Sequence, residues 1–154
     1  AMAEKAARVA ALALDVSELI DRLGLPPAAR DLDLELVYHS ACSMQHGQKI
    51  TDLPKRLLAA VGFTVREPRE GHLCCGSAGT YNILQPEIAT RLAERKARNL
   101  ERTRARVVAT GNIGCITQLR TATRLPVVHT VQLLDWATGG PVPAPLAELV
   151  GAPA

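Results

Sequence analysis

Residues 106–115 read RVVATGNIGC, a short β-branched run that leads through glycines to a cysteine. The run predicts a strand over Arg106–Thr110, and Gly111 to Cys115 is expected to open the next helix. A strand that turns directly into a helix is the repeating unit of parallel α/β proteins. The stretch therefore indicates a fold class and places Cys115 in the first turn of a helix.

The rest of the chain repeats this alternation. Three more strands are expected over 34–39, 63–66 and 127–129. Helices are expected over 3–23, from about Asp52 to Gly62, from Pro86 onward and around 131–136. We predict an α/β fold with a small parallel sheet of about four strands in the order 2-1-3-4, helices on both faces and an N-terminal helix.

Three segments differ in composition. We expect residues 1–28 to form the N-terminal helix and a linker, residues 29–138 a cysteine-rich α/β domain, and residues 139–154 a loosely packed tail rich in proline and glycine. The leading Ala1-Met2 suggests a fragment of a longer subunit.

Composition and charge argue against several classes of protein. Only 3% of the residues are aromatic, so stacking platforms for nucleic acid are not expected. The formal net charge is only +3, which indicates no strongly charged partner. Glu87 and Arg91 have the i,i+4 spacing of a solvated helix face, which does not indicate a nucleic-acid patch. No secretory signal is recognised and no apolar run approaches the ~20 residues that span a bilayer, so a cytoplasmic location with reduced thiols is expected.

Each cysteine follows a predicted strand. The carboxyl ends of parallel strands meet at one edge of the sheet, where such sheets bind ligands. Thiolates that converge there suit Zn²⁺ or an iron–sulfur cluster. We therefore predict a metal site formed by Cys42, Cys74, Cys75 and Cys115.

Histidines near the strand ends are further candidates. We interpret His39, His46 and His129 as nitrogen donors or as hydrogen-bonding groups around the cofactor. Gly76 and Gly79 flank the paired cysteines and permit a tight backbone.

The long helix from Pro86 is predicted to face the core through Ile88, Leu92 and Leu100. Lys96 on this helix is interpreted as a solvated residue.

Rival uses of the cysteines fit less well. Cys115 and Arg120 are one residue too close for a tyrosine-phosphatase loop, and the segment 76–80 lacks the lysine of a Walker loop. Disulfides are disfavoured in a cytosolic chain. A thiol redox sensor remains open, because Cys115 at a helix N-terminus is expected to ionise readily.

The same residues resemble a known family. The 31 residues between Cys42 and Cys74, the motif Cys74-Cys75-Gly76 and the 36 residues between Cys75 and Asn112 are similar to the cysteine-rich CCG domain. That domain occurs in heterodisulfide reductases and in iron–sulfur subunits of flavin-linked dehydrogenases. The stretches YHSAC (38–42), CCGSAGTYN (74–82) and ATGNIGC (109–115) resemble the C-terminal part of glycolate oxidase iron–sulfur subunits.

The resemblance implies a non-catalytic fragment of an electron-transfer subunit of a glycolate (2-hydroxyacid) oxidase. Such subunits join a ferredoxin-like part with 4Fe–4S clusters to two cysteine-rich domains, of which this chain resembles the second. Their flavoprotein partners hold the FAD, and the complex passes electrons to the respiratory chain, which implies a peripheral position at the cytoplasmic membrane. The alternative is a structural zinc or scaffold domain that docks the flavoprotein subunits.

One position departs from the family pattern. The CCG pattern ends in Cys-x-x-Cys, and Asn112 stands where the first of these cysteines would be. Because asparagine is a poor ligand for iron–sulfur clusters, a cluster that needs five thiolates is disfavoured. Asn112 is expected to open the helix beside the cofactor and to face the same pocket as Cys115. Separately, loss of the metal is compatible with a domain isolated from its subunit.

Overall fold

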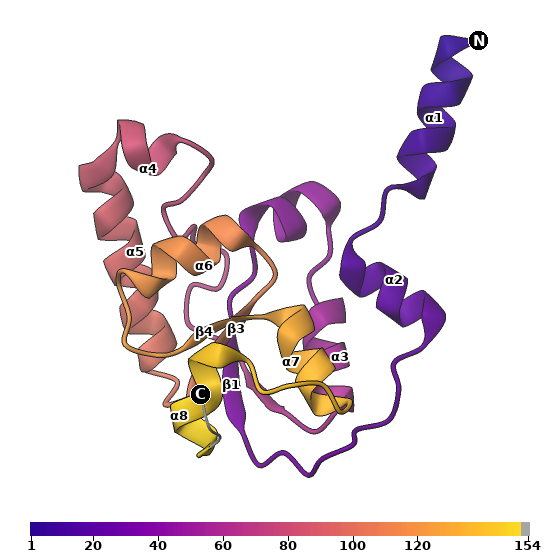
Figure 1. Ribbon diagram of the computed structural model, residues 1–154. Helices are drawn as coiled ribbons and strands as arrows, with labels where there is room; N and C mark the ends of the chain where they lie inside the picture. Colours follow the sequence, from indigo (N-terminus) through magenta and orange to yellow (C-terminus); the bar gives the residue numbers. More distant parts are fainter. Residues whose placement is uncertain (152–154) are drawn as a thin grey trace.

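The protein is a parallel sheet with helices on both faces, described over residues 1–151 by a computed structural model (Figure 1). The strands are β1 (Glu35–Tyr38), β2 (Thr64–Arg66), β3 (Val107–Thr110) and β4 (Val127–His129). They pair in parallel in the order β2-β1-β3-β4, which confirms the predicted fold class and strand order. All four carboxyl ends therefore lie at one edge of the sheet.

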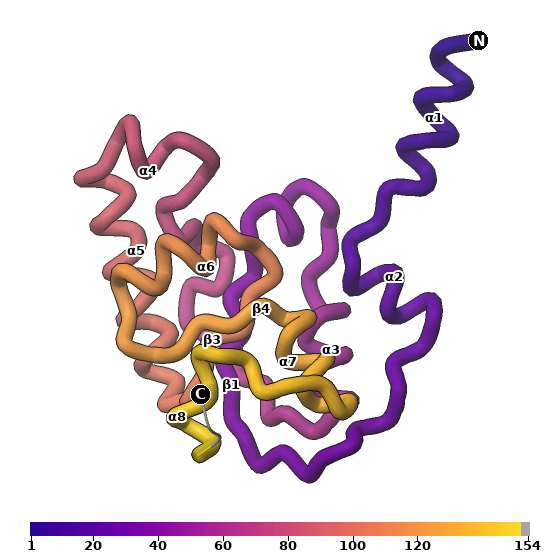
Figure 2. The backbone as a smooth tube through the Cα atoms, viewed as in Figure 1, coloured from indigo at the N-terminus to yellow at the C-terminus, as the bar shows by residue number. Residues whose placement is uncertain are grey.

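Helices cover both faces because successive strand residues point in opposite directions. The helices are α1 (Met2–Leu12), α2 (Val16–Leu23), α3 (Leu53–Ala60), α4 (Tyr81–Leu84), α5 (Pro86–Glu101), α6 (Ile113–Arg120), α7 (Thr130–Ala137) and α8 (Ala147–Val150), with a π-helix η1 (Ser43–Gln48) and a 3-10 helix η2 (Ala144–Leu146). Leu36 and Tyr38 of β1 belong to the core beneath α3 and α7, whereas Val37 belongs to the core beneath α5 and α6. The backbone tube shows one layer of helices on each side of the sheet (Figure 2).

The N-terminal segment differs from the single helix predicted over 3–23. It forms α1 and α2, separated at Asp15, whose carboxylate accepts a hydrogen bond from Ser17 N at 2.9 Å while Glu18 accepts one from Asp15 N at 2.9 Å. This capping box starts a new helix, and the expectation of one continuous helix is wrong.

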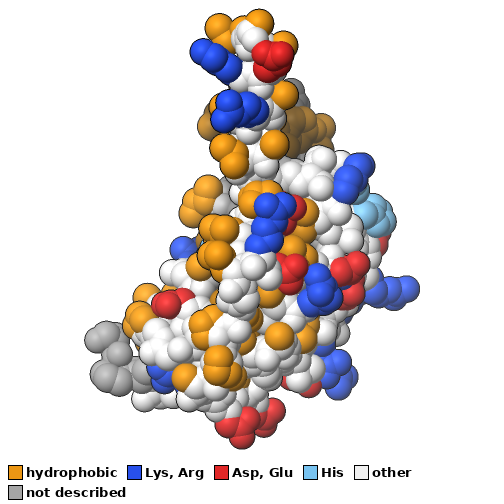
Figure 3. Space-filling model, turned by 90° about the vertical axis from the view of Figure 1, so that its right-hand side faces the viewer, with side chains coloured by type: hydrophobic (Ala, Val, Ile, Leu, Met, Phe, Trp, Pro, Cys, Tyr) orange, Lys and Arg blue, Asp and Glu red, His pale blue; other side chains and the backbone are white. Residues whose placement is uncertain are grey.

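The helix α1 projects from the body of the protein and buries no residue (Figure 1). Hydrophobic side chains remain exposed over the N-terminal segment, as the space-filling view shows (Figure 3). They are Met2, Val9, Leu12, Val16, Leu19 and Leu23. Within residues 1–151, no helix has both the length and the apolar character needed to cross a membrane.

The C-terminal segment packs more closely than expected. Leu146 is fully buried in the core beneath α3 and α7, and Val142 and Leu149 pack against the same core. Arg30 donates hydrogen bonds to the carbonyl oxygens of Trp136, Gly139 and Gly140. The expectation of a loosely packed tail is therefore wrong over 142–149, and its last part, 152–154, lies outside the described residues.

We predict that the chain folds without metal. The core beneath α3 and α7 contains no cysteine among its described residues, so its hydrophobic contacts do not depend on a ligand. A chelator should leave the far-ultraviolet circular dichroism spectrum unchanged while elemental analysis shows that the metal has been removed. Unfolding that accompanies metal loss would contradict this prediction.

Candidate metal centre

The four cysteines line one cavity at the carboxyl edge of the sheet, with a volume of about 340 Å³. Cys42 follows β1, Cys74 and Cys75 lie in the loop after β2, and Cys115 lies in the first turn of α6. The other lining residues are Ala41, Ser43, Ser77, Ala78, Gly79, Asn112 and Gly114. Thiols far apart in the sequence thus reach one place because parallel strands end at one edge.

The thiols form a connected series. The Cys74 thiol interacts with the thiols of Cys42 and Cys75, and the Cys75 thiol also interacts with that of Cys115. Burial raises the pKa of Cys42, and the neighbouring Cys75 thiol raises the pKa of Cys74. Cys115 raises the pKa of Cys75 to about 11. At neutral pH these three thiols are therefore protonated without metal, and metal binding must release their protons.

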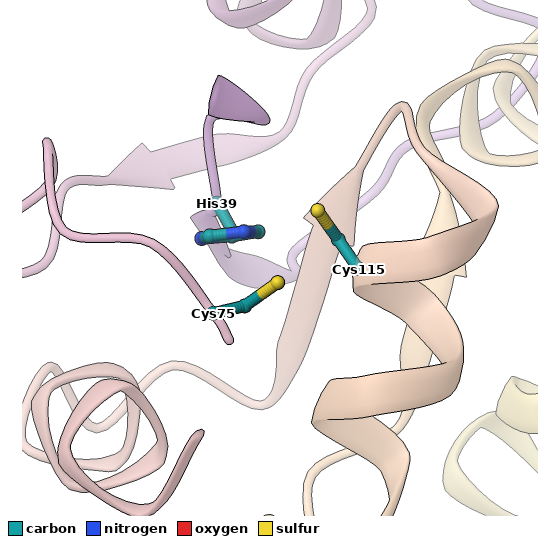
Figure 4. A group of neighbouring side chains, drawn as sticks. All are labelled: His39, Cys75 and Cys115. Carbon is teal, nitrogen blue, oxygen red and sulfur yellow. The ribbon is translucent and has the colours of Figure 1, made fainter. Parts of the chain in front are cut away.

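His39 points toward two of these cysteines (Figure 4). Its nitrogens and the sulfurs of Cys75 and Cys115 offer three ligand atoms within 4.8 Å of one another. The His39 ring is fully buried, and neither ring nitrogen has a hydrogen-bond partner among residues 1–151. Burial lowers the pKa of His39 to about 3, so the ring is neutral. A buried neutral imidazole without a partner beside thiols fits a metal ligand, and this donor set suits zinc or iron.

The other two candidate histidines lie away from these cysteines. His46 is exposed on the π-helix η1. His129 caps α7, where its Nδ1 accepts a hydrogen bond from Val131 N at 3.2 Å. The structure therefore brings His39, but neither His46 nor His129, into the group of potential ligands.

Asn112 has a structural role that the family pattern did not reveal. It is the N-cap of α6, and its side-chain oxygen accepts a hydrogen bond from Cys115 N at 3.2 Å. An asparagine at this position satisfies an otherwise unpaired backbone donor of the first helical turn. Asn112 lines the cavity and holds the turn that carries Cys115.

The interpretation of Lys96 as a solvated residue is wrong. Its side chain is fully buried, and Nζ donates hydrogen bonds to the carbonyl oxygens of Glu70 at 2.8 Å and Gly71 at 3.3 Å. Burial lowers the pKa of Lys96, an effect that the charges of the cysteines Cys42, Cys74 and Cys75 oppose. Lys96 therefore lies near the candidate ligands and is the principal site residue that sequence reasoning missed.

A different pattern on α5 could have identified Lys96. Ile88, assigned to the core stripe, is 47% exposed, although Leu100 is buried as predicted. The buried residues of α5 are Ala89, Ala93, Lys96, Ala97, Asn99 and Leu100. These positions share one helix face, so the alanine spacing was the available signal.

The small residues of this face let the cysteine loop approach α5. Gly76 has φ +92°, and a Cβ atom there would lie 2.4 Å from the carbonyl oxygen of Ala89. Glycine is therefore required after the paired cysteines for two reasons: it adopts the positive φ easily, and its lack of a Cβ atom permits the close contact with Ala89.

Glu70 attaches the start of the same loop to α5. Its carboxylate accepts hydrogen bonds from Arg95 and from Asn99, the latter at 2.7 Å. The hydrogen bond from Arg95, followed by that from Asn99, lowers the pKa of Glu70 to about 2.

This pKa gives a pH-dependent prediction. The contribution of Glu70 to the free energy of unfolding is complete above its ordinary pKa of 4.5 and is lost as the pH falls toward about 2. In urea unfolding, Glu70→Gln should be less stable than the wild type at neutral pH, and the two should converge in acid. Glu94→Gln, which removes only an exposed contact of 4.0 Å to Arg98, is the control and should change little. A constant difference between Glu70→Gln and wild type at all pH values would refute the assignment.

Together, the fold and site define a parallel α/β protein with a thiol-rich cavity at the carboxyl edge of its sheet. The chain belongs to the cysteine-rich domain family CCG, whose model matches residues 36–120. This range includes all four cysteines, together with His39 and Lys96.

Two of the similar proteins have names that mention glycolate or lactate. The chain is 38% identical over 135 residues to the glycolate oxidase iron-sulfur subunit of Escherichia coli K12, covering 88% of this chain and 33% of that protein. It is 28% identical over 123 residues to lactate utilization protein A of Oceanobacillus iheyensis, covering 76% of this chain and 50% of that protein. The chain thus spans between a third and a half of these relatives.

Proposed function

We propose that this chain is the metal-binding, cysteine-rich module of an electron-transfer subunit in a complex that oxidises glycolate or a related 2-hydroxyacid. The observation that carries the proposal is the cavity at which four cysteines meet beside the unpartnered His39. The names of the similar proteins support the iron–sulfur class and the 2-hydroxyacid substrate.

In this proposal Cys42, Cys74, Cys75 and Cys115 are the ligands, and His39 is a further donor. A bound iron–sulfur cluster would supply one-electron transfer. The residues of the chain hold the ligands at fixed positions: Asn112 orients the turn of Cys115, and Gly76 lets the paired cysteines lie against α5. Burial of Cys75, Cys115 and His39 limits access of water to the inner side of the centre.

The partners belong to the same proposal. Flavoprotein subunits that carry FAD would perform the oxidation, and the ferredoxin-like part of the subunit would exchange electrons with this module. The chain itself contributes no catalytic residue to the oxidation, and contact with the cytoplasmic membrane would occur through the complex.

Anaerobic purification followed by metal and sulfide analysis tests the function. The expected result is iron with acid-labile sulfide and the broad visible absorption of an iron–sulfur cluster. Iron reconstitution of the purified chain gives a second measurement if the cluster is lost during purification. Failure of both to load iron and sulfide would reject the iron–sulfur proposal.

A structural zinc site is the second candidate. It is favoured by the group of His39, Cys75 and Cys115, since one imidazole and two or more thiolates are common zinc ligands. Stoichiometric zinc without sulfide, and without visible absorption, would support this candidate over the cluster.

A further inference from the structure

Lys96 is a buried cation whose contacts do not include a carboxylate. Its Nζ is bound to the carbonyl oxygens of Glu70 and Gly71, while the carboxylate of Glu70 is bound by Arg95 and Asn99. Among residues 1–151, Lys96 forms no ion pair within 4.0 Å. Burying an ammonium without a compensating negative charge is unfavourable, so a nearby anion is expected in the working protein.

The cysteine thiolates are the main groups that can supply this negative charge, ahead of the Glu70 carboxylate. When Cys42, Cys75 and Cys74 are ionised, their charges act on Lys96, and the charge of Lys96 acts in turn on Cys42 and His39. The carbonyl contacts hold the ammonium to Glu70 and Gly71, in the loop that leads to the paired cysteines. Lys96 is therefore fixed to the loop that carries two of the candidate ligands.

We propose that the Lys96 ammonium is the counter-charge of the metal–thiolate centre, stabilising its anionic form and raising its reduction potential. The inference rests on the proposed function. Four thiolates around a divalent metal carry more negative than positive charge, and a fixed cation in a medium of low dielectric constant favours that complex. The same cation favours addition of an electron, because net charge is one determinant of cluster potential.

Lys96 is thus a positioning and electrostatic residue, and the test must separate its charge from its packing. Lys96→Met keeps a long side chain but removes the charge, and Lys96→Arg keeps the charge. Glu70→Gln is the matched loop control, because it removes the Glu70 charge and weakens the Arg95 and Asn99 contacts while keeping the Lys96 ammonium. Circular dichroism should first establish that each variant is folded.

Two measurements should be made on all four proteins. Cobalt(II) titration, followed by thiolate-to-cobalt absorption, should show Lys96→Met binding about 10–100-fold more weakly than wild type, with Lys96→Arg close to wild type. After anaerobic iron and sulfide reconstitution, the midpoint potential of Lys96→Met should be lower than that of wild type. Lys96→Arg should keep the wild-type potential, and Glu70→Gln should not lower it.

The outcomes distinguish this inference from the function on which it rests. Wild-type protein that binds neither cobalt nor a cluster would reject both. A metal-loaded wild type with unchanged affinity and potential in Lys96→Met would reject only the counter-charge. Equal loss of binding in folded Lys96→Met and Lys96→Arg would assign Lys96 to packing and also overturn the inference, whereas loss in Lys96→Met alone would support it.

Discussion

Replacing Gly76 with alanine is expected to destabilise the protein by about 3 kcal/mol or more. The new Cβ atom would lie 2.4 Å from the carbonyl oxygen of Ala89, and the backbone at residue 76 has φ +92°. The obstacle is helix backbone, which cannot rotate aside as a flexible side chain would. Either α5 or the cysteine loop must therefore move. Urea unfolding measures the loss of stability, and cobalt binding measures the effect on the cysteine site.

Gly79→Ala is the matched control for this prediction. Gly79 lies in the same loop and also has a positive φ, +66°, but a Cβ atom there would meet no atom within 4 Å. The substitution should therefore show only the backbone penalty, about 1–2 kcal/mol. If Gly76→Ala and Gly79→Ala lose equal stability, the close contact with α5 is unimportant and the explanation given for Gly76 is incorrect.

Replacing Cys75 with serine is expected to remove nearly all bound metal. Cys75 is the thiol that interacts with both Cys74 and Cys115, and it also belongs to the group with His39. A serine hydroxyl is a harder, less acidic donor than a thiol and is poorly suited to zinc or iron–sulfur binding. The loss should exceed the about 10–100-fold change that follows removal of an outer hydrogen-bond partner.

Ser77→Ala provides the control for the cysteine substitution. Ser77 is buried and lines the same cavity, but it contributes no thiol. Metal content after anaerobic reconstitution and desalting should remain near wild type in Ser77→Ala and fall sharply in Cys75→Ser. Full metal retention by folded Cys75→Ser would mean that Cys75 is not a ligand.

Strand–helix alternation was sufficient to predict much of the fold. The β-branched run before Thr110 and similar runs elsewhere indicated four parallel strands, and their order agrees with the structure. The N-terminal break was missed although its signal was local, because Asp15, Ser17 and Glu18 form a capping box within an otherwise continuous apolar pattern.

The cysteine site was partly predictable for a topological reason. A cysteine placed after a parallel strand lies at the carboxyl edge wherever the strand stands in the sheet, so Cys42, Cys74, Cys75 and Cys115 could be grouped without coordinates. The same argument could not decide which of the candidate histidines lies beside the thiols. His39 directly follows a central strand and is buried, whereas His46 is exposed on a π-helix that packs on the core through Met44.

The sequence by itself determined the parallel sheet and the edge at which the thiols gather. Local residue patterns define the strands and helices, and their alternation along the chain requires crossovers that make the strands parallel. Only the tertiary structure decided which face of α5 is buried. Ile88 is the more hydrophobic choice, but the loop containing Gly76 must approach the helix backbone closely, and the small side chain of Ala89 permits this contact. Lys96 is carried inward on that same face, where loop carbonyl oxygens satisfy its ammonium beside the thiols.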